Sequence, residues 1–76
     1  MPSLYDRVRT LVEVDTYQHG ILEAGSEGVI VHVWTNPEGY AIDLEIPAPE
    51  LAGGLTFENV DLAPDQFVVI DRSEQT

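Results

Sequence analysis

Apolar and polar residues alternate with a period of two along most of this chain, which is the pattern of half-buried β-strands. The clearest alternation runs from Gly28 to Ile46 and is interrupted once, at Asn36-Pro37-Glu38-Gly39. Proline at the second position and glycine at the fourth position of this segment favour a type I turn. The pattern therefore predicts a β-hairpin that is closed by residues 36–39.

The register of this hairpin follows from its turn and can be checked against the apolar pattern. Three cross-strand pairs join apolar side chains: Val33 with Ile42, Val31 with Leu44, and Val29 with Ile46. A shift by one residue opposes valines to Asp43 and Glu45, so we expect the valines to face the core. The second strand presents its apolar residues on the same face: Tyr40, Ile42, Leu44 and Ile46.

Three further strands are expected on either side of this hairpin. They cover residues 7–14, 55–60 and 67–70. A long loop with turns near Gly20 and Gly25 joins the first strand to the hairpin, because glycines are frequent there and β-formers are few. The segment 61–66 has room for one tight helical turn, and another is compatible with residues 50–52.

These elements describe an all-β fold, a small five-stranded SH3-like barrel with a short helical turn before the last strand. An OB-fold is the nearest alternative, but it usually needs a longer chain and a helix between its third and fourth strands. We expect one barrel domain over residues 1–71 and a flexible polar C-terminal tail over residues 72–76.

Residues 22–33, 40–45 and 62–70 carry a glycine-bounded entry into the second strand and a Leu-x-Pro-Asp-Gln turn before the last strand. In these features, which cover most of the chain, the sequence resembles the bacterial domain of unknown function 4926. The resemblance implies an SH3-like fold, a bacterial source and a non-enzymatic binding role, with the antidote of a toxin–antitoxin or immunity pair as one version. Residues 47–54 depart from the family pattern, which leaves the pairing of the third and fourth strands open.

The charge balance limits the partners of this chain. Fourteen aspartates and glutamates stand against three arginines and no lysine, which gives a net charge of −11. Such a polyanion repels the phosphate backbone of nucleic acids, whereas it attracts basic proteins from a distance. Arg7 and Arg9 are expected to pair with Glu13 or with neighbouring acids. We therefore expect a basic protein partner and no nucleic acid, and a homodimer stays open.

Cysteine is absent, which excludes disulfides, thiolate metal sites and thiol nucleophiles. No stretch approaches the roughly 20 apolar residues of a membrane-spanning helix, and residues 1–9 carry no apolar run suited to a signal peptide. These features predict a cytoplasmic protein that does not bind a membrane.

His32 and Asp43 are the candidate pair for catalysis, because the expected register places them opposite each other. A histidine that is oriented by a carboxylate can act as a general base. No serine of the chain stands in a nucleophile motif, so a structural cross-strand pair is the simpler interpretation. We therefore expect no enzymatic activity and no catalytic residue.

Neither a metal nor a cofactor is expected. His19 and His32 lie far apart in the sequence and lack a metal-ligand spacing. The glycines between residues 20 and 28 lack the lysine of a phosphate-binding loop, and Glu23 and Glu27 among them would repel a phosphate.

The face of the strands opposite the valines combines apolar and acidic residues, which is typical of a protein contact surface unless closure of the barrel buries it. The candidate protein-binding residues are Ile30, His32, Trp34, Asp43, Glu45 and Glu58. A reader of proline-rich peptides is one alternative, because Tyr17 and Trp34 are aromatic and acids surround them. We expect a non-catalytic acidic protein-binding module, an antitoxin or immunity protein that neutralises a basic partner in its most concrete version. The alternative is a small accessory subunit of a larger enzyme complex.

Overall fold

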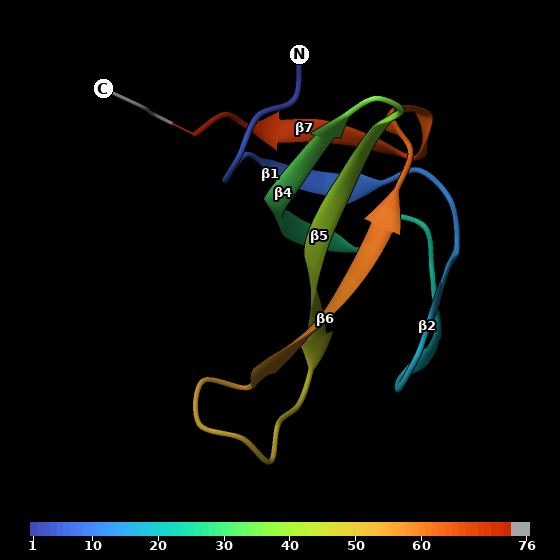
Figure 1. Ribbon diagram of the computed structural model, residues 1–76. Helices are drawn as coiled ribbons and strands as arrows, with labels where there is room; N and C mark the ends of the chain where they lie inside the picture. The colour runs from blue at the N-terminus through green and yellow to red at the C-terminus, as the bar shows by residue number, and fades with distance from the viewer. Residues whose placement is uncertain (74–76) are drawn as a thin grey trace.

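The computed structural model describes residues 1–73 as strands and one short 3-10 helix (Figure 1). In chain order these elements are β1 (Arg7–Thr10), β2 (Val14–Thr16), β3 (Gly20–Leu22), β4 (Glu27–Thr35), β5 (Glu38–Pro47), β6 (Leu55–Leu62), the 3-10 helix η1 (Pro64–Gln66) and β7 (Phe67–Asp71). The five expected strands correspond to β1, β4, β5, β6 and β7, and the helical turn before the last strand is confirmed. β2 and β3 are additional.

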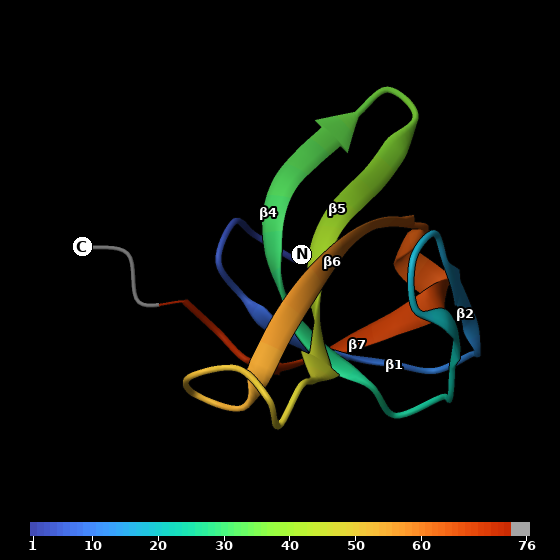
Figure 2. The same ribbon diagram turned by 90° about the horizontal axis from the view of Figure 1, so that it is seen from below.

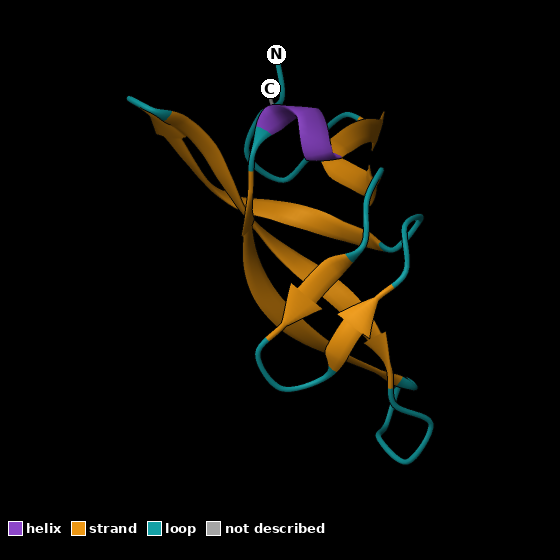
Figure 3. Ribbon diagram, turned by 90° about the vertical axis from the view of Figure 1, so that its right-hand side faces the viewer, coloured by secondary structure: helices purple, strands orange, loops and turns teal. Residues whose placement is uncertain are grey.

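Five strands form one antiparallel sheet in the order β6-β5-β4-β1-β7, and β2 and β3 form a separate two-stranded sheet. β4 and β5 are long and curved, and β6 runs diagonally across the view (Figure 2). The short helix η1 (purple in Figure 3) precedes β7. Within residues 1–73 no ladder joins the edge strands β6 and β7, so the sheet stays open. The all-β prediction is thereby confirmed.

The core lies against one face of the sheet, and β5 contributes more residues to it than any other strand. Tyr40, Ile42 and Leu44 are fully buried, as their alternation predicts. Full burial of an aliphatic side chain of this size contributes roughly 1.5–3 kcal/mol. The ring of Tyr40 also contacts Phe67 edge-on, with 5.2 Å between the ring centroids. The core cluster comprises Val8, Val14, Ile30, Tyr40, Ile42, Leu44, Leu62 and Phe67.

The expected turn between the two central strands is wrong. β4 ends at Thr35 and β5 begins at Glu38, so the turn consists of Asn36 and Pro37 alone. The peptide bond between these two residues is cis. Glu38, which was expected inside the turn, pairs with Thr35 and continues the ladder.

The expected register is also wrong, and none of the three valine pairs forms. The observed pairs are Val33 with Tyr40, Ile30 with Ile42, Val29 with Asp43, and Gly28 with Leu44. Paired residues point to the same side of a sheet, so the partners of the buried β5 residues are those that face the core.

A β-bulge between Ile30 and His32 is the physical reason for the change of face. Val31 is the extra residue and has no partner in the ladder, so the phase of β4 reverses at this point. Val33 faces the core beyond the bulge, whereas Ile30 faces it before the bulge and is fully buried. Val29 therefore points to the side away from the core, which we call the outer face.

The expected strand over residues 7–14 is wrong in its second half, because β1 ends at Thr10. The N–H of Leu11 donates to a backbone carbonyl just before β7 (2.8 Å), and the chain then leaves the sheet. The β2–β3 hairpin begins at Val14, the last residue of that expected strand, and continues inside the expected loop. Turns occur where they were expected, with φ of 71° at Gly20 and 95° at Gly25, conformations that glycine adopts without steric cost.

The pairing of β5 with β6 is continuous from Tyr40 with Leu62 to Pro47 with Leu55. The segment of residues 47–54 therefore does not disturb the ladder. β6 ends two residues later than expected, and residues 50–52 form turns rather than a helix.

The two ends of the described chain meet at Asp6, which is only 1% exposed. Its carboxylate accepts hydrogen bonds from the backbone N–H groups of Ser3 (2.9 Å) and Ser73 (2.7 Å). The guanidinium of Arg72 lies 3.6 Å from the same carboxylate. These contacts hold the first residues of the expected flexible tail, and residues 74–76 of that tail lie outside the described residues.

The close approach of β4 and β5 predicts different responses of two glycines to substitution. A Cβ on Gly28 would lie 3.0 Å from Cγ2 of Ile42 and closer still to the carbonyl oxygen of Asp43. We expect Gly28→Ala to destabilise the fold by about 1–3 kcal/mol, because the strands must separate. At Gly39 the nearest atom, Cε3 of Trp34, would be 3.6 Å away, so Gly39→Ala is the matched control. Urea unfolding measures both, and equal losses would contradict this explanation.

Candidate functional site

The candidate pair of His32 and Asp43 does not form, either as a catalytic pair or as the structural cross-strand pair that was the simpler interpretation. Asp43 lies opposite Val29 in the hairpin, not opposite His32. The carboxylate of Asp43 accepts a hydrogen bond from the side-chain amide of Asn59 (3.0 Å). The imidazole of His32 instead contacts the indole of Trp34 edge-on, with 4.7 Å between the ring centroids. The hypothesis of a general base with an orienting carboxylate is therefore wrong for these two residues.

Four of the six candidate protein-binding residues belong to the outer face. They are His32, Trp34, Asp43 and Glu45, as their pairing in the sheet shows. Ile30 is fully buried in the core, and Glu58 is only 9% exposed on the same side as its partner Leu44. The structure therefore places four of the residues along the outer face of the sheet and the other two on its core face.

Arg7 is held on the outer face by two carboxylates. Its guanidinium donates to Glu45 (2.7 and 3.1 Å) and to Glu27 (2.9 Å), and Arg9 donates to Glu27 (3.1 Å). The hydrogen bonds to Glu45 and Glu27 raise the pKa of Arg7 above its usual value. The hydrogen bonds from Arg9 and Arg7 lower the pKa of Glu27. The expected pairing of both arginines with acids is confirmed, with Glu27 and Glu45 in place of Glu13.

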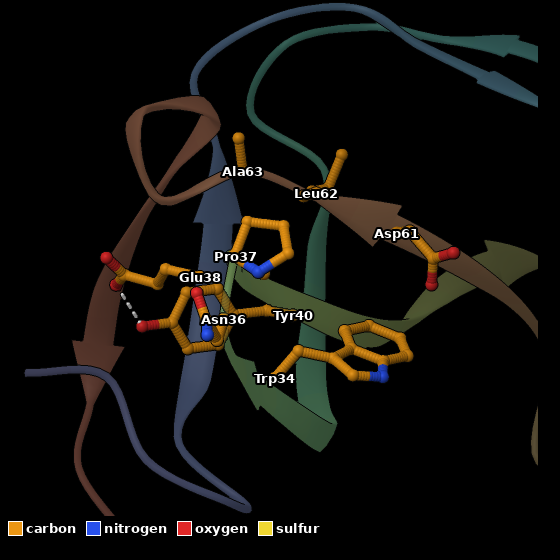
Figure 4. A pocket seen from close by; sticks show the side chains of 9 residues that line it. Trp34, Asn36, Pro37, Glu38, Tyr40, Asp61, Leu62 and Ala63 are labelled. Carbon is orange, nitrogen blue, oxygen red and sulfur yellow. Dashed lines mark hydrogen bonds between the residues drawn. The ribbon is translucent and has the colours of Figure 1, made fainter.

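An apolar pocket of about 350 Å³ opens beside the turn between β4 and β5 (Figure 4). Trp34 comes from the end of β4 and Leu62 from the end of β6. The indole of Trp34 is 42% exposed, so a ligand can reach it. The apolar walls are Trp34, Pro37, Tyr40, Leu62 and Ala63, and the acids at the pocket are Glu38 and Asp61.

Tyr40 lines this pocket, and its contacts fix the orientation of its ring. Its hydroxyl donates a hydrogen bond to the carboxylate of Glu38 (Figure 4). Burial and the hydrogen bond to Glu38 raise the pKa of Tyr40 to about 12. The phenol is therefore protonated at neutral pH and already uses its donor, while Phe67 contacts the ring from the core. Because Tyr40 is also fully buried, the aromatic surface that a ligand can reach in this pocket is that of Trp34.

A second hollow of about 340 Å³, which we call the acidic slot, lies between the β2 segment and β6. Its carboxylates come from Glu13, Asp15 and Asp61, and its apolar lining from Val14, Val60 and Leu62. Asp61 and Leu62 line both the apolar pocket and the acidic slot, so the two hollows adjoin.

Glu58 attaches the β2–β3 hairpin to the sheet. Its carboxylate accepts hydrogen bonds from the backbone N–H groups of Tyr17 and Gln18 (3.1 Å), and Nδ1 of His19 lies 2.6 Å from it. Burial alone raises the pKa of Glu58, but the hydrogen bonds from His19, Gln18 and Tyr17 outweigh it and lower the pKa below its usual value. This carboxylate therefore holds the hairpin beside β6 at one end of the acidic slot.

The sequence interpretation missed the acidic slot and the structural role of Glu58. Leu55 and Phe57 are the large apolar residues at the start of β6, yet they point outwards and are 41% and 54% exposed. The signal lies further along the strand, where Val60 and Leu62 alternate in phase with Glu58. Continuing the alternation to these two residues would have placed Glu58 on the core side.

Within the part of the chain that the structure describes, no three histidine, aspartate or glutamate side chains gather closely enough to hold a metal ion. No helix of the described residues has the length and apolar character needed to cross a membrane. Comparison of the chain with protein-family models, with curated proteins and with solved structures finds no match. The functional interpretation therefore rests on the geometry of the two hollows.

Loss of the Glu58 charge is expected to loosen the hairpin. Glu58→Gln removes a charged acceptor of three hydrogen bonds, so we expect a lower urea midpoint at pH 7 and faster amide exchange in β2 and β3. A carboxyl group whose pKa is lowered by folding stabilises the fold above its unfolded pKa and loses this contribution as the pH falls through the folded pKa. The difference between wild type and variant should therefore be full at pH 7 and shrink below the usual value of 4.5.

The exposed Glu50, in the turn after β5, provides the control for this experiment. Glu50→Gln should leave the urea midpoint and the exchange of the hairpin amides unchanged at pH 7. A midpoint difference between wild type and Glu58→Gln that persists at full size at pH 3 would contradict the assigned role of the carboxylate.

Proposed function

We propose that this protein is a non-catalytic, cytoplasmic protein-binding module that recognises a basic segment of a partner protein. The observation that carries this proposal is the junction of the apolar pocket and the acidic slot at Asp61 and Leu62. The half-exposed Trp34 offers an aromatic anchor, the kind of residue in which interface energy concentrates. Carboxylates next to such an anchor favour a cationic side chain beside the apolar one.

The cations of the chain do not neutralise this surface. Arg7 and Arg9 are bound to Glu27 and Glu45 on the outer face, and Arg72 donates to the carbonyl of Met1 (3.0 Å) near the chain ends. With a net charge of −11, the protein attracts a basic partner and repels nucleic acid. Self-association through the two hollows would bring like charges together, so a partner of opposite charge is favoured over a second copy.

The order of the strands supports an SH3-like barrel as the architecture behind this function. A long connection that carries a hairpin joins β1 to β4, and η1 precedes the edge strand β7. In this proposal the β2–β3 hairpin is the first loop of the barrel, and the acidic slot lies where that loop approaches β6. Membership in the domain of unknown function 4926 belongs to the same proposal.

An antitoxin or immunity protein that neutralises a basic partner is the most concrete version of this function. The acidic slot would then cover a cationic site of the partner and exclude the anionic substrate of that site. In the alternative, an accessory subunit of a larger enzyme, the same surface would be covered permanently by the catalytic chain.

Peptide titrations followed by the fluorescence of Trp34, the single tryptophan of the chain, test the proposed function. The probes are twelve-residue peptides rich in arginine and leucine and their counterparts with glutamate in place of arginine. We expect the basic peptides alone to bind at low salt, with affinity falling as the salt concentration rises. Binding of the acidic peptides with similar affinity would overturn the proposal.

Two pairs of variants locate the binding surface. Trp34→Ala should weaken the basic peptides about tenfold or more, whereas Phe57→Ala, which removes an exposed aromatic residue outside both hollows, should change affinity less than about twofold. Asp61→Asn should reduce affinity at low salt and much less at high salt, and Asp71→Asn on β7 is its control. Isothermal titration calorimetry measures the peptide affinity of all variants, including the one without tryptophan. If neither Trp34→Ala nor Asp61→Asn changes this affinity, the result would count against this surface.

A further inference from the structure

β6 presents a free edge whose unpaired backbone groups can be identified. The N–H of Ala48 donates to the carbonyl of Gly54 (2.9 Å), so at this position, which is in line with the β5–β6 register, the bonded backbone groups of the two segments point towards each other. Hydrogen-bonded pairs recur at every second residue of an antiparallel ladder. The even-numbered residues of β6 therefore bond to β5. Phe57, Asn59 and Asp61 direct their N–H and C=O groups towards the free edge, since β6 is the last strand of the sheet.

The β2–β3 hairpin approaches this edge without pairing with it. In the described chain, β2 pairs only with β3. The contact with β6 runs through the Glu58 side chain, which reaches the N–H groups of Tyr17 and Gln18. A side chain is interposed where a ladder would need direct backbone contact, and the acidic slot opens along residues 59–62 of β6. The acidic slot therefore lies along the free edge of β6.

Most proteins protect a free edge with lysine, proline or a bulge. β6 contains neither lysine nor proline, and its ladder with β5 shows no register shift. The charges beside the edge are those of Asp61 and, across the acidic slot, Glu13 and Asp15. These carboxylates repel a second copy of this acidic chain and attract a cationic segment, so the edge is protected against self-pairing but open to a basic partner.

We propose that an extended basic segment of the partner adds to β6 as a further strand of the sheet, inside the acidic slot. This inference rests on the proposed function and specifies how the partner is held. The backbone groups of Asn59 and Asp61 would pair with the segment, as in other cases of strand addition. Its alternate side chains would meet Val60 and Leu62 on one face and Asp61 on the other. The segment that fits therefore alternates apolar and cationic residues.

An eight-residue peptide of alternating arginine and valine, blocked at both ends, is the probe for this inference. We expect it to bind the ¹⁵N-labelled protein and to shift the amide resonances of Asn59 and Asp61 most strongly. Two N-methylated versions carry the methyl groups on all arginine amides or on all valine amides. Because only alternate amides of an added strand face its neighbour, one version should bind about tenfold or more weakly and the other nearly as the parent peptide does. Loss of binding when the arginine amides are methylated indicates antiparallel addition of the peptide, and loss of binding when the valine amides are methylated indicates parallel addition.

Asn59→Pro and Asn59→Ala form the matched pair of variants. Both remove the side-chain hydrogen bond to Asp43, but only proline removes the N–H that faces the free edge. Proline is tolerated on edge strands at such positions, so the ladder with β5 can persist. We expect Asn59→Pro to weaken the probe about tenfold relative to Asn59→Ala. If Asn59→Pro does not fold, as shown by lost amide dispersion, the methylated peptides decide the question alone.

The outcomes separate this inference from the proposed function. If both methylated peptides bind as the parent does, or if the probe shifts Trp34 and leaves Asn59 and Asp61 unchanged, strand addition is overturned while the proposed function stands. If no basic peptide binds at low salt, both are overturned. If sedimentation shows a dimer that Asn59→Pro abolishes, a second copy occupies the edge and the inference is likewise overturned.

Discussion

The carboxylate of Glu58 determines how the first hairpin meets the sheet. It accepts hydrogen bonds from Tyr17 and Gln18 and contacts His19, so a side chain and not a backbone ladder connects β6 to this hairpin. A buried carboxylate is costly unless several donors satisfy it, and here three donors do so. Because the connection uses a side chain, the edge of β6 stays unpaired beyond this point. The acidic slot exists for that reason.

The position of Trp34 depends on a different constraint, the bulge in β4. The extra residue Val31 reverses the phase of the strand, so that His32 and Trp34 belong to the outer face while Ile30 enters the core. Before the bulge, Gly28 allows the two strands to approach so closely that a methyl group would collide with the neighbouring backbone. The close pairing of β4 and β5 before the bulge and the reversed phase of β4 after it together bring the indole of Trp34 to the rim of the apolar pocket.

Much of the fold follows from the alternation of apolar residues, whereas the site does not. The buried face of β5, the turn glycines and the helical turn before β7 are local features, and the sequence predicts them. The predicted register of β4 is wrong because a bulge depends on tertiary packing. The composition of residues 36–39 fits a type I turn and the observed two-residue turn equally well. The burial of Glu58 was missed for a related reason. Its donors lie about forty residues earlier in the chain, and no local pattern reports them.

Two groups of acids in this chain have different physical roles. Glu27 and Glu45 face arginines, so the outer face of the sheet is locally compensated. Within residues 1–73, no arginine forms an ion pair with Glu13, Asp15 or Asp61, so the carboxylates that line the acidic slot are not compensated in this way. A concave site with one sign of charge focuses the field more than a uniformly charged surface does. Long-range attraction and the free hydrogen-bonding edge thus coincide at the acidic slot, as the proposed addition of a basic strand requires.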